Sequence, residues 1–390
     1  MTADRSSASA VLEAITEVVP TLRENGRAAE DRRWIPDENI ELLDKAGVFR
    51  MAVPGRFGGL DLPLSDQAAV LEEISRGCGS TGWTAAAWVS TAWMIGLYPD
   101  KAQEELFGNG SVRVSGGFTP GGSLTPTEGG YLLNGSWRFN TGCRAADWDM
   151  LAALRELPDG SVDMVYALVP MSELEIADDW HVSAAIGTGS STTTAKDVFV
   201  PAHRVADGEA AVEGALLEHV ATVGRRYGLI GFVLAEGVAV HIGMAQAAYE
   251  LFVERLPGKA ISYTNWEEQS RHPLTQIGVA TAENKIVAAR ALNDQVIDLL
   301  QRRADAGEHP TVEERATIHG RCGYAIQLVK EAVETLHAMS GASALARSAH
   351  FQRFYRDLEG LSLHGMMAPV SNLEVQGRVL LGLAPDSPVL

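Results

Sequence analysis

The chain has 390 residues, of which 46% are hydrophobic and 21% are charged, and its formal net charge is −18 at pH 7. This composition is typical of a globular protein, and the length allows two or three structural domains. The negative charge argues against binding to nucleic acid or to an anionic membrane, because their phosphate groups would be repelled.

Apolar residues recur at helical spacing through residues 1–110, which predicts an N-terminal helical domain. The run Trp83–Tyr98 is shorter than the ~20 apolar residues that span a bilayer, so we expect a buried core helix. Gly77–Gly82 matches a GxGxxG pattern, but it follows a helix, so it predicts a turn between helices and no dinucleotide site. The expected helices are Val11–Ala29, Pro36–Lys45, Ser65–Arg76, Trp83–Tyr98 and one from Pro99 to about Gly108.

The pattern changes between residues 111 and 208 to short β-branched and aromatic runs broken by Gly, Pro and Asp. Short strands of this kind predict a central β domain, either a small sandwich or a barrel. Asp159-Gly160 predicts a hairpin turn. The candidate strands are Val112–Phe118, Tyr131–Asn140, Met150–Glu156, Met164–Val169, Glu173–Trp180 and Thr192–Phe199.

Helical periodicity returns over residues 209–390, which predicts a C-terminal four-helix bundle. Its expected helices are Ala221–Leu256, Thr275–Ala306, Thr311–Met339 and Phe351–Leu381. The class is therefore α+β, with a helical domain, a β domain and a helical bundle in that order. The three cysteines are far apart and indicate neither disulfides nor a metal site, so we expect a cytoplasmic protein.

The segment Phe351–Gly365 resembles the C-terminal signature of the acyl-CoA dehydrogenase superfamily. In that family a catalytic glutamate lies nine residues after the arginine that corresponds to Arg356. The residue at this place is Gly365, which has no side chain to take up a proton, and His364 precedes it. The resemblance therefore implies the fold of the family together with a different reaction.

Two further segments resemble flavin-binding parts of the same superfamily. Gly129–Gly142 is similar to the segment that ends against the isoalloxazine ring, and Thr141 has the place of a hydroxyl that points at the flavin. Gly187–Ser190 resembles a Gly-Thr-Gly-Ser run of the family. The hydroxyls of Thr188 and Ser190 can bind a flavin phosphate or the ribityl chain.

From about residue 34 to 382 the chain resembles the two-component flavin-dependent monooxygenases (group D) of the acyl-CoA dehydrogenase fold, such as 4-hydroxyphenylacetate hydroxylases and hydroxylases of natural-product biosynthesis. The resemblance implies hydroxylation of a phenolic or polyketide-like aromatic substrate by a flavin hydroperoxide. That species forms from O2 and reduced FMN or FAD, which an NAD(P)H-dependent flavin reductase supplies. The resemblance also implies a homotetramer.

The same resemblance gives the expected site residues. Thr141 would hydrogen-bond the flavin or its oxygen adduct. His364 would deprotonate a phenol or stabilise the phenolate, and a pKa of about 6.5 suits that role. The expected cofactor-binding residues are Phe139, Thr141, Gly142, Thr188, Ser190, Arg271 and Gly341, with Arg271 near a subunit interface, and the expected pocket residues are Trp83, Trp93, Glu236 and Gly365.

Three alternatives stay open. Thr91–Met94 lacks the second histidine that such monooxygenases often carry in this helix, which keeps N-oxygenation of an amine or amino sugar in view. Glu236 or Glu254 could be a relocated base of an acyl-CoA dehydrogenase, which would bind FAD tightly. A flavin or acyl-group binder without catalysis is the third alternative.

Overall fold

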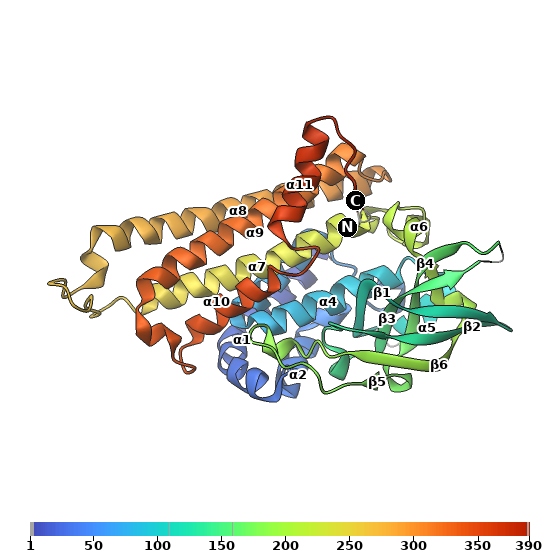
Figure 1. Ribbon diagram of the computed structural model, residues 1–390, viewed down its shortest axis with the longest axis horizontal. Helices are drawn as coiled ribbons and strands as arrows, with labels where there is room; N and C mark the ends of the chain where they lie inside the picture. The colour runs from blue at the N-terminus through green and yellow to red at the C-terminus, as the bar shows by residue number, and fades with distance from the viewer. Residues whose placement is uncertain (1–3, 109, 158, 388–389) are drawn as a thin grey trace.

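The computed structural model of the protein describes residues 4–108, 110–157, 159–387 and 390. Within these ranges, eleven α-helices and one seven-stranded sheet form two regions (Figure 1). The long helices form one end of the molecule and the sheet forms the other. Helix α4 (Gly79–Ile95) lies between them and packs on both.

The N-terminal helices are α1 (Asp4–Arg32), α2 (Asp37–Ala46), α3 (Leu64–Gly77), α4 and α5 (Asp100–Phe107). All five were predicted, but α4 begins earlier than expected, and Cys78 alone separates it from α3. The predicted junction between two helices lies in the GxGxxG segment, but it is shorter than expected, because all of this segment except Cys78 is helix. A Cβ on Gly82 would clash with Ser75 of α3, so the close contact of the two helices explains a glycine inside α4.

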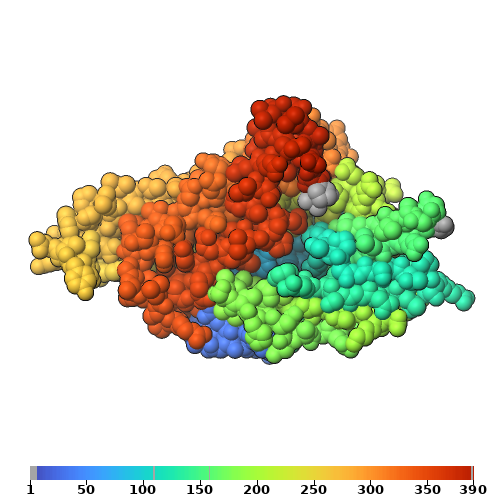
Figure 2. Space-filling view, in the orientation of Figure 1, coloured from blue at the N-terminus to red at the C-terminus, as the bar shows by residue number. Residues whose placement is uncertain are grey.

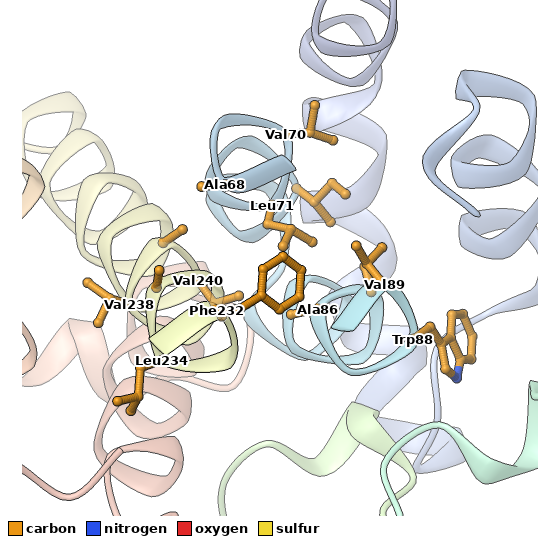
Figure 3. Packing of buried hydrophobic residues seen from close by; sticks show 14 of the residues in the cluster. Ala68, Val70, Leu71, Ala86, Trp88, Val89, Phe232, Leu234, Val238 and Val240 are labelled. Atoms are coloured by element: carbon orange, nitrogen blue, oxygen red, sulfur yellow. The ribbon is translucent and has the colours of Figure 1, made fainter. Parts of the chain in front are cut away.

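The largest apolar core joins α3, α4 and the long helix α7 (Leu229–Glu254). Leu71 of α3, Ala86 of α4 and Phe232 of α7 point toward one another between these helices (Figure 3). α7 has the length and hydropathy of a membrane span, but 89% of its apolar window is buried inside the protein, as in the core helix of a soluble protein. This core fixes α4 and α7 relative to each other, and both carry candidate site residues.

The sheet has the strand order β5-β6-β2-β1-β3-β4-β7. β1 and β3 are parallel, and the other neighbouring pairs are antiparallel. Leu151 of β3, Val165 of β4 and Val198 of β6 share one core, so the sheet curls around it and agrees with the predicted barrel-like domain. The strands are β1 (Val114–Thr127), β2 (Gly130–Trp137), β3 (Trp148–Glu156), β4 (Val162–Pro170), β5 (Glu175–Ile176), β6 (Thr193–Pro201) and β7 (Val205–Asp207).

The predicted strand Glu173–Trp180 is mostly wrong, because only the two residues of β5 pair with the sheet. The Asp179 carboxylate accepts a hydrogen bond from the Thr192 amide at 3.0 Å, so a side chain holds this segment in place of a strand ladder. The hairpin at Asp159-Gly160 is confirmed, since β3 and β4 pair antiparallel on either side of it.

The C-terminal helices are α6 (Gly208–Val212), α7, α8 (Pro273–Ala306), α9 (Val312–Ser340), α10 (His350–Leu361) and α11 (Pro369–Leu380). α7, α8, α9 and α10 lie side by side as the predicted bundle (Figure 1). The expected start of α7 at Ala221 is wrong, because the chain reaches Leu229 through a short 3-10 turn and a loop.

The single helix predicted over Phe351–Leu381 is also wrong, because it breaks between α10 and α11. Pro369 is the first residue of α11 and has no N–H to continue a helix, and it favours an extended conformation at Ala368. The backbone turns back at His364, whose carbonyl accepts from the amides of Met367 at 2.8 Å and Ala368 at 2.9 Å. His364 and Gly365 therefore lie in a turn and not on a helix.

Candidate functional site

A hollow lies between the α10–α11 turn and the sheet. Figure 2 shows it between the red C-terminal segment and the teal strands, with atoms in the blue of the N-terminal third on its floor. α4 is buried along its length except at Trp83 and Ala87, which lie one turn apart and are partly open to solvent. A Cβ built on Gly365 would meet no atom within 4 Å, so the space beside it is open.

Two histidines flank Trp83 at this hollow. The Trp83 ring centroid lies 5.4 Å from that of His364 and 6.1 Å from that of His241 on α7, both in edge contacts. His241 is fully buried, and its Nδ1 donates to the Gly237 carbonyl at 2.7 Å. Burial lowers the pKa of His241 to about 4. His364 is exposed at the edge of the hollow, and the desolvation of its ring by the neighbouring protein lowers its pKa as well, so both rings are neutral at pH 7.

His241 is a site residue that the sequence patterns do not predict. α4 carries no second histidine, but α7 places one against the same tryptophan. A signal was present, because His241 is a polar residue between Val240 and Ile242 in an otherwise apolar run. With Nδ1 donating, Nε2 is the acceptor nitrogen, and within the described residues it has no hydrogen-bond partner.

Three hydroxyls of the predicted flavin site form one chain of hydrogen bonds. The Thr188 hydroxyl donates to the Ala185 carbonyl at 2.9 Å, so its hydrogen is used. Ser190 must then donate to Thr188 at 2.7 Å, and Thr141 must donate to Ser190 at 3.0 Å. All three hydroxyls are buried. Thr141 therefore keeps only lone pairs, and it can accept a hydrogen bond from a ligand but cannot donate one.

The loop that carries Thr141 presents an exposed aromatic ring and a glycine on either side of it. Phe139 is 63% exposed with a positive φ, and its ring meets the Trp180 ring edge-on at 6.0 Å. Gly142 also has a positive φ, and a Cβ there would come within 2.7 Å of Trp88 Nε1. That buried indole N–H has no hydrogen-bond partner in the described part of the chain. The exposed Phe139 ring, the orphan indole donor and the acceptor at Thr141 fit a flavin.

The Arg-Asp pair of α10 holds this site together. The Asp357 carboxylate accepts from the Ala185 amide at 2.7 Å and from the Ser80 hydroxyl of α4 at 3.2 Å. Arg356 donates to the Ser183 carbonyl and pairs with Glu30 of α1. Burial raises the pKa of Asp357 to about 6. Arg356 and Asp357 therefore fix the backbone around Ala185, whose carbonyl accepts the last hydrogen bond of the hydroxyl chain.

Arg271 and Gly341 lie apart from the hydroxyl chain. Both are at the outer end of the helical bundle, where Gln269 donates to the Met339 carbonyl at 2.7 Å. The segment between α7 and α8 extends past that end, opposite the sheet (Figure 1). Arg271 is exposed and pairs with Glu268 at 2.5 Å. One chain thus does not bring these two residues to Thr141.

The remaining expected residues have different surroundings. Trp93 is core, since it stacks on Phe232 at 4.5 Å and its indole donates to the Arg225 carbonyl at 3.0 Å. Glu236 is fully buried between α4 and α7 and accepts from the Ser90 hydroxyl. Glu254 is exposed at the end of α7, about 20 Å along the helix from His241.

Comparisons with known proteins agree over nearly the whole chain. Residues 6–110 match the sequence profile "Acyl-CoA dehydrogenase, N-terminal domain", and residues 237–369 match "Acyl-CoA dehydrogenase, C-terminal domain". The chain is 33% identical over 385 residues to the flavin-dependent monooxygenase, oxygenase subunit HsaA, of Mycobacterium tuberculosis, and the match covers 97% of both chains. It is 27% identical to the p-hydroxyphenylacetate 3-hydroxylase oxygenase component of Acinetobacter baumannii, over 97% of this chain and 91% of that protein.

Solved structures show the same likeness. XiaF from Streptomyces sp., in complex with FADH2 and glycerol, superposes with a TM-score of 0.93 at 26% identity, and the match covers 100% of this chain and 99% of XiaF. The HsaA monooxygenase from M. tuberculosis superposes with a TM-score of 0.91 at 30% identity, over 98% of this chain and 100% of HsaA.

Proposed function

Because this chain belongs to the flavin-dependent monooxygenases of the acyl-CoA dehydrogenase fold, we propose that it is the oxygenase component of a two-component system and hydroxylates a phenolic aromatic substrate. The observation that best supports this proposal is the chain of three hydroxyls, which ends in a hydrogen-bond acceptor at Thr141. Gly365 offers no carboxylate at the place of the dehydrogenase base, and the space beside it is open.

The hydroxyl chain matches a reduced flavin. N5 of a reduced flavin carries a hydrogen and donates, whereas N5 of an oxidised flavin accepts. Thr141 can only accept, so it would hold the reduced form and oppose the oxidised one. Phe139 and Gly142 would lie against the ring. When bound, reduced FMN or FAD would supply the two electrons that activate O2, and one atom of that O2 would enter the substrate.

His364 would hold the substrate oxygen. Its Nδ1 accepts from the Met366 amide at 3.3 Å, so the neutral ring carries its proton on Nε2. That N–H can donate to a phenolate, which keeps electron density on the aromatic ring. Of the two roles expected for His364, the position of this proton supports stabilising the phenolate over removing the proton.

The other parts of the proposal concern assembly. Arg271 and Gly341 lie at the outer end of the helical bundle, and a neighbouring subunit of a homotetramer would bring them to the flavin. A separate NAD(P)H-dependent reductase would supply the reduced flavin. The protein would act in the cytoplasm, where such reductants are available.

The test combines the purified protein with a flavin reductase, NADH, FMN or FAD, and a set of monocyclic and fused phenols. We expect a nearly colourless protein and products that carry one added oxygen atom, formed only when the reductase is present. A yellow protein whose flavin is reduced by acyl-CoA, without oxygen in the product, would overturn the proposal in favour of a dehydrogenase.

A further inference from the structure

A carboxylic acid is buried in the contact between α4 and α7. Glu236 is 0% exposed, and its Oε2 accepts a hydrogen bond from the Ser90 hydroxyl. The contact is otherwise apolar at this level, since Trp93 of α4 stacks on Phe232 of α7 one turn away. Packing the two helices does not need an acid, because apolar side chains of similar size would fill the same space at no desolvation cost.

Ser90 directs its hydroxyl to a carboxyl group on another helix, as Ser80 at the start of α4 does toward Asp357. Three other hydroxyls of α3 and α4 donate to the carbonyl four residues earlier, Thr84 at 2.9 Å, Thr91 at 2.8 Å and Ser75 of α3 at 2.7 Å. Such bonds to the preceding turn are the ordinary solution for Ser and Thr inside a helix. Ser90 instead turns its hydroxyl across to Glu236, and this bond fixes the orientation of the carboxyl group.

The second oxygen of the acid has nothing to bind. Glu236 Oε1 has no hydrogen-bond partner among the described residues. Burial raises the pKa of Glu236 to about 8, so the group is neutral near pH 7. Because Oε2 accepts from Ser90, the proton lies on Oε1, which is then a buried O–H donor without an acceptor. Such a group is stabilised by any ligand that offers it an acceptor.

The position of the pair relative to the hollow supports a ligand. Trp83, Ala87 and Ser90 follow one another at i, i+4 and i+7, so they lie along one face of α4. Trp83 and Ala87 are the partly open residues of this helix, and Ser90 is 7% exposed at the deep end of the same face. Trp83 contacts His364, and Ser90 lies about 10 Å farther along the helix axis.

We propose that Glu236, oriented by Ser90, donates a hydrogen bond to a carbonyl oxygen at the far end of the substrate. The substrate is then a fused polycyclic phenol with its hydroxyl at His364 and a ketone or quinone oxygen about 10 Å away along α4. A single phenol ring does not span that length. This inference rests on the proposed function, because it takes the hollow as the substrate pocket, and it assigns Glu236 to substrate selection and not to proton abstraction.

The test uses a matched pair of three-ring ligands, a linear tricyclic phenol with a ketone on its far ring and the same phenol without the ketone. Their dissociation constants are measured by calorimetry for the wild-type protein, Glu236→Met and Glu236→Gln, and hydroxylation is measured separately with reduced flavin. We expect the wild type to prefer the ketone about tenfold, the value of one hydrogen bond to a buried donor. Glu236→Met should lose this preference by weakening ketone binding alone. Glu236→Gln should keep it, because the amide N–H still donates.

Ser75→Ala is the control, since it removes another buried hydroxyl that packs on α7 and should leave both constants unchanged. A folded Glu236→Met protein that keeps the tenfold preference would overturn the inference and leave the acid as a link between helices. Equal dissociation constants of the wild-type protein for the two ligands would also overturn the inference. If the preference is present but neither phenol is hydroxylated, the inference stands and the proposed function fails.

Discussion

The direction of the hydroxyl chain predicts that the protein distinguishes reduced from oxidised flavin, and Ser190→Ala tests this directly. In the wild type, the hydrogen bond from Thr141 to Ser190 at 3.0 Å uses the hydroxyl hydrogen of Thr141. Removing the Ser190 hydroxyl frees that hydrogen, and Thr141 can then donate to N5 of an oxidised flavin. The preference for reduced flavin should therefore fall.

The size of the effect follows from the hydrogen-bond inventory. In the wild type the reduced flavin gains one hydrogen bond, about 1 kcal/mol, while the oxidised flavin meets an unmatched buried acceptor that costs about 1–3 kcal/mol. Losing the unmatched contact should lower the ratio of the two dissociation constants by about 2 kcal/mol, or roughly 30-fold. The constants are measured by fluorescence titration of FMN, in air for the oxidised form and anaerobically after reduction.

Ser191→Ala is the matched control, because Ser191 is also buried in this loop. Among the described residues its hydroxyl accepts a hydrogen bond only from Arg144, at 3.5 Å, and so lies outside the chain of hydroxyls. This variant should leave the ratio unchanged. The reasoning is refuted if Ser190→Ala keeps the wild-type ratio, or if Ser191→Ala lowers it by the same amount.

Three further changes test other parts of the site. His364→Ala should lower the hydroxylation rate by about 100-fold and leave the Kd for reduced flavin unchanged; wild-type rates would exclude His364 from the reaction. Arg271→Ala should weaken flavin binding by about tenfold without a change in Tm, because the side chain is 77% exposed, and unchanged binding would remove Arg271 from the cofactor site. The pKa of His241 is lowered to about 4 in the folded protein, so its contribution to stability is present above about pH 6.5 and is lost as the pH falls toward 4. Between pH 7 and pH 4 the free energy of unfolding, measured with urea, should fall by about 3 kcal/mol more in the wild type than in His241→Leu. An equal fall in both proteins would contradict the burial of a neutral His241.

Most of the architecture was predictable because apolar spacing reports directly on helices and strands. The long periodic segments of α8 and α9 were placed within two residues of their observed bounds. The errors are local. Apolar residues continue at helical spacing through the break before Pro369, so periodicity does not reveal it, and the proline itself is the local signal of the break in the sequence.

The candidate site was harder to predict, because its parts come from distant segments. Sequence motifs identify Thr141 and Ser190 as candidate flavin-binding hydroxyls. The direction of their hydrogen bonds depends on the Ala185 carbonyl, which belongs to neither motif. His241 and Ser90 matter only through the packing of α7 against α4. Side-chain orientation across helices follows from tertiary contacts, so a sequence pattern on one helix does not report it.

The central claim is that the protein transfers one atom of O2 to a phenol using reduced flavin. The most direct measurement is mass spectrometry of the product formed under isotope-labelled dioxygen, with a flavin reductase and NADH. We predict one labelled oxygen atom in each product molecule and no product when the reductase is omitted. A product without label, or substrate oxidised to an alkene with no oxygen added, would contradict the account.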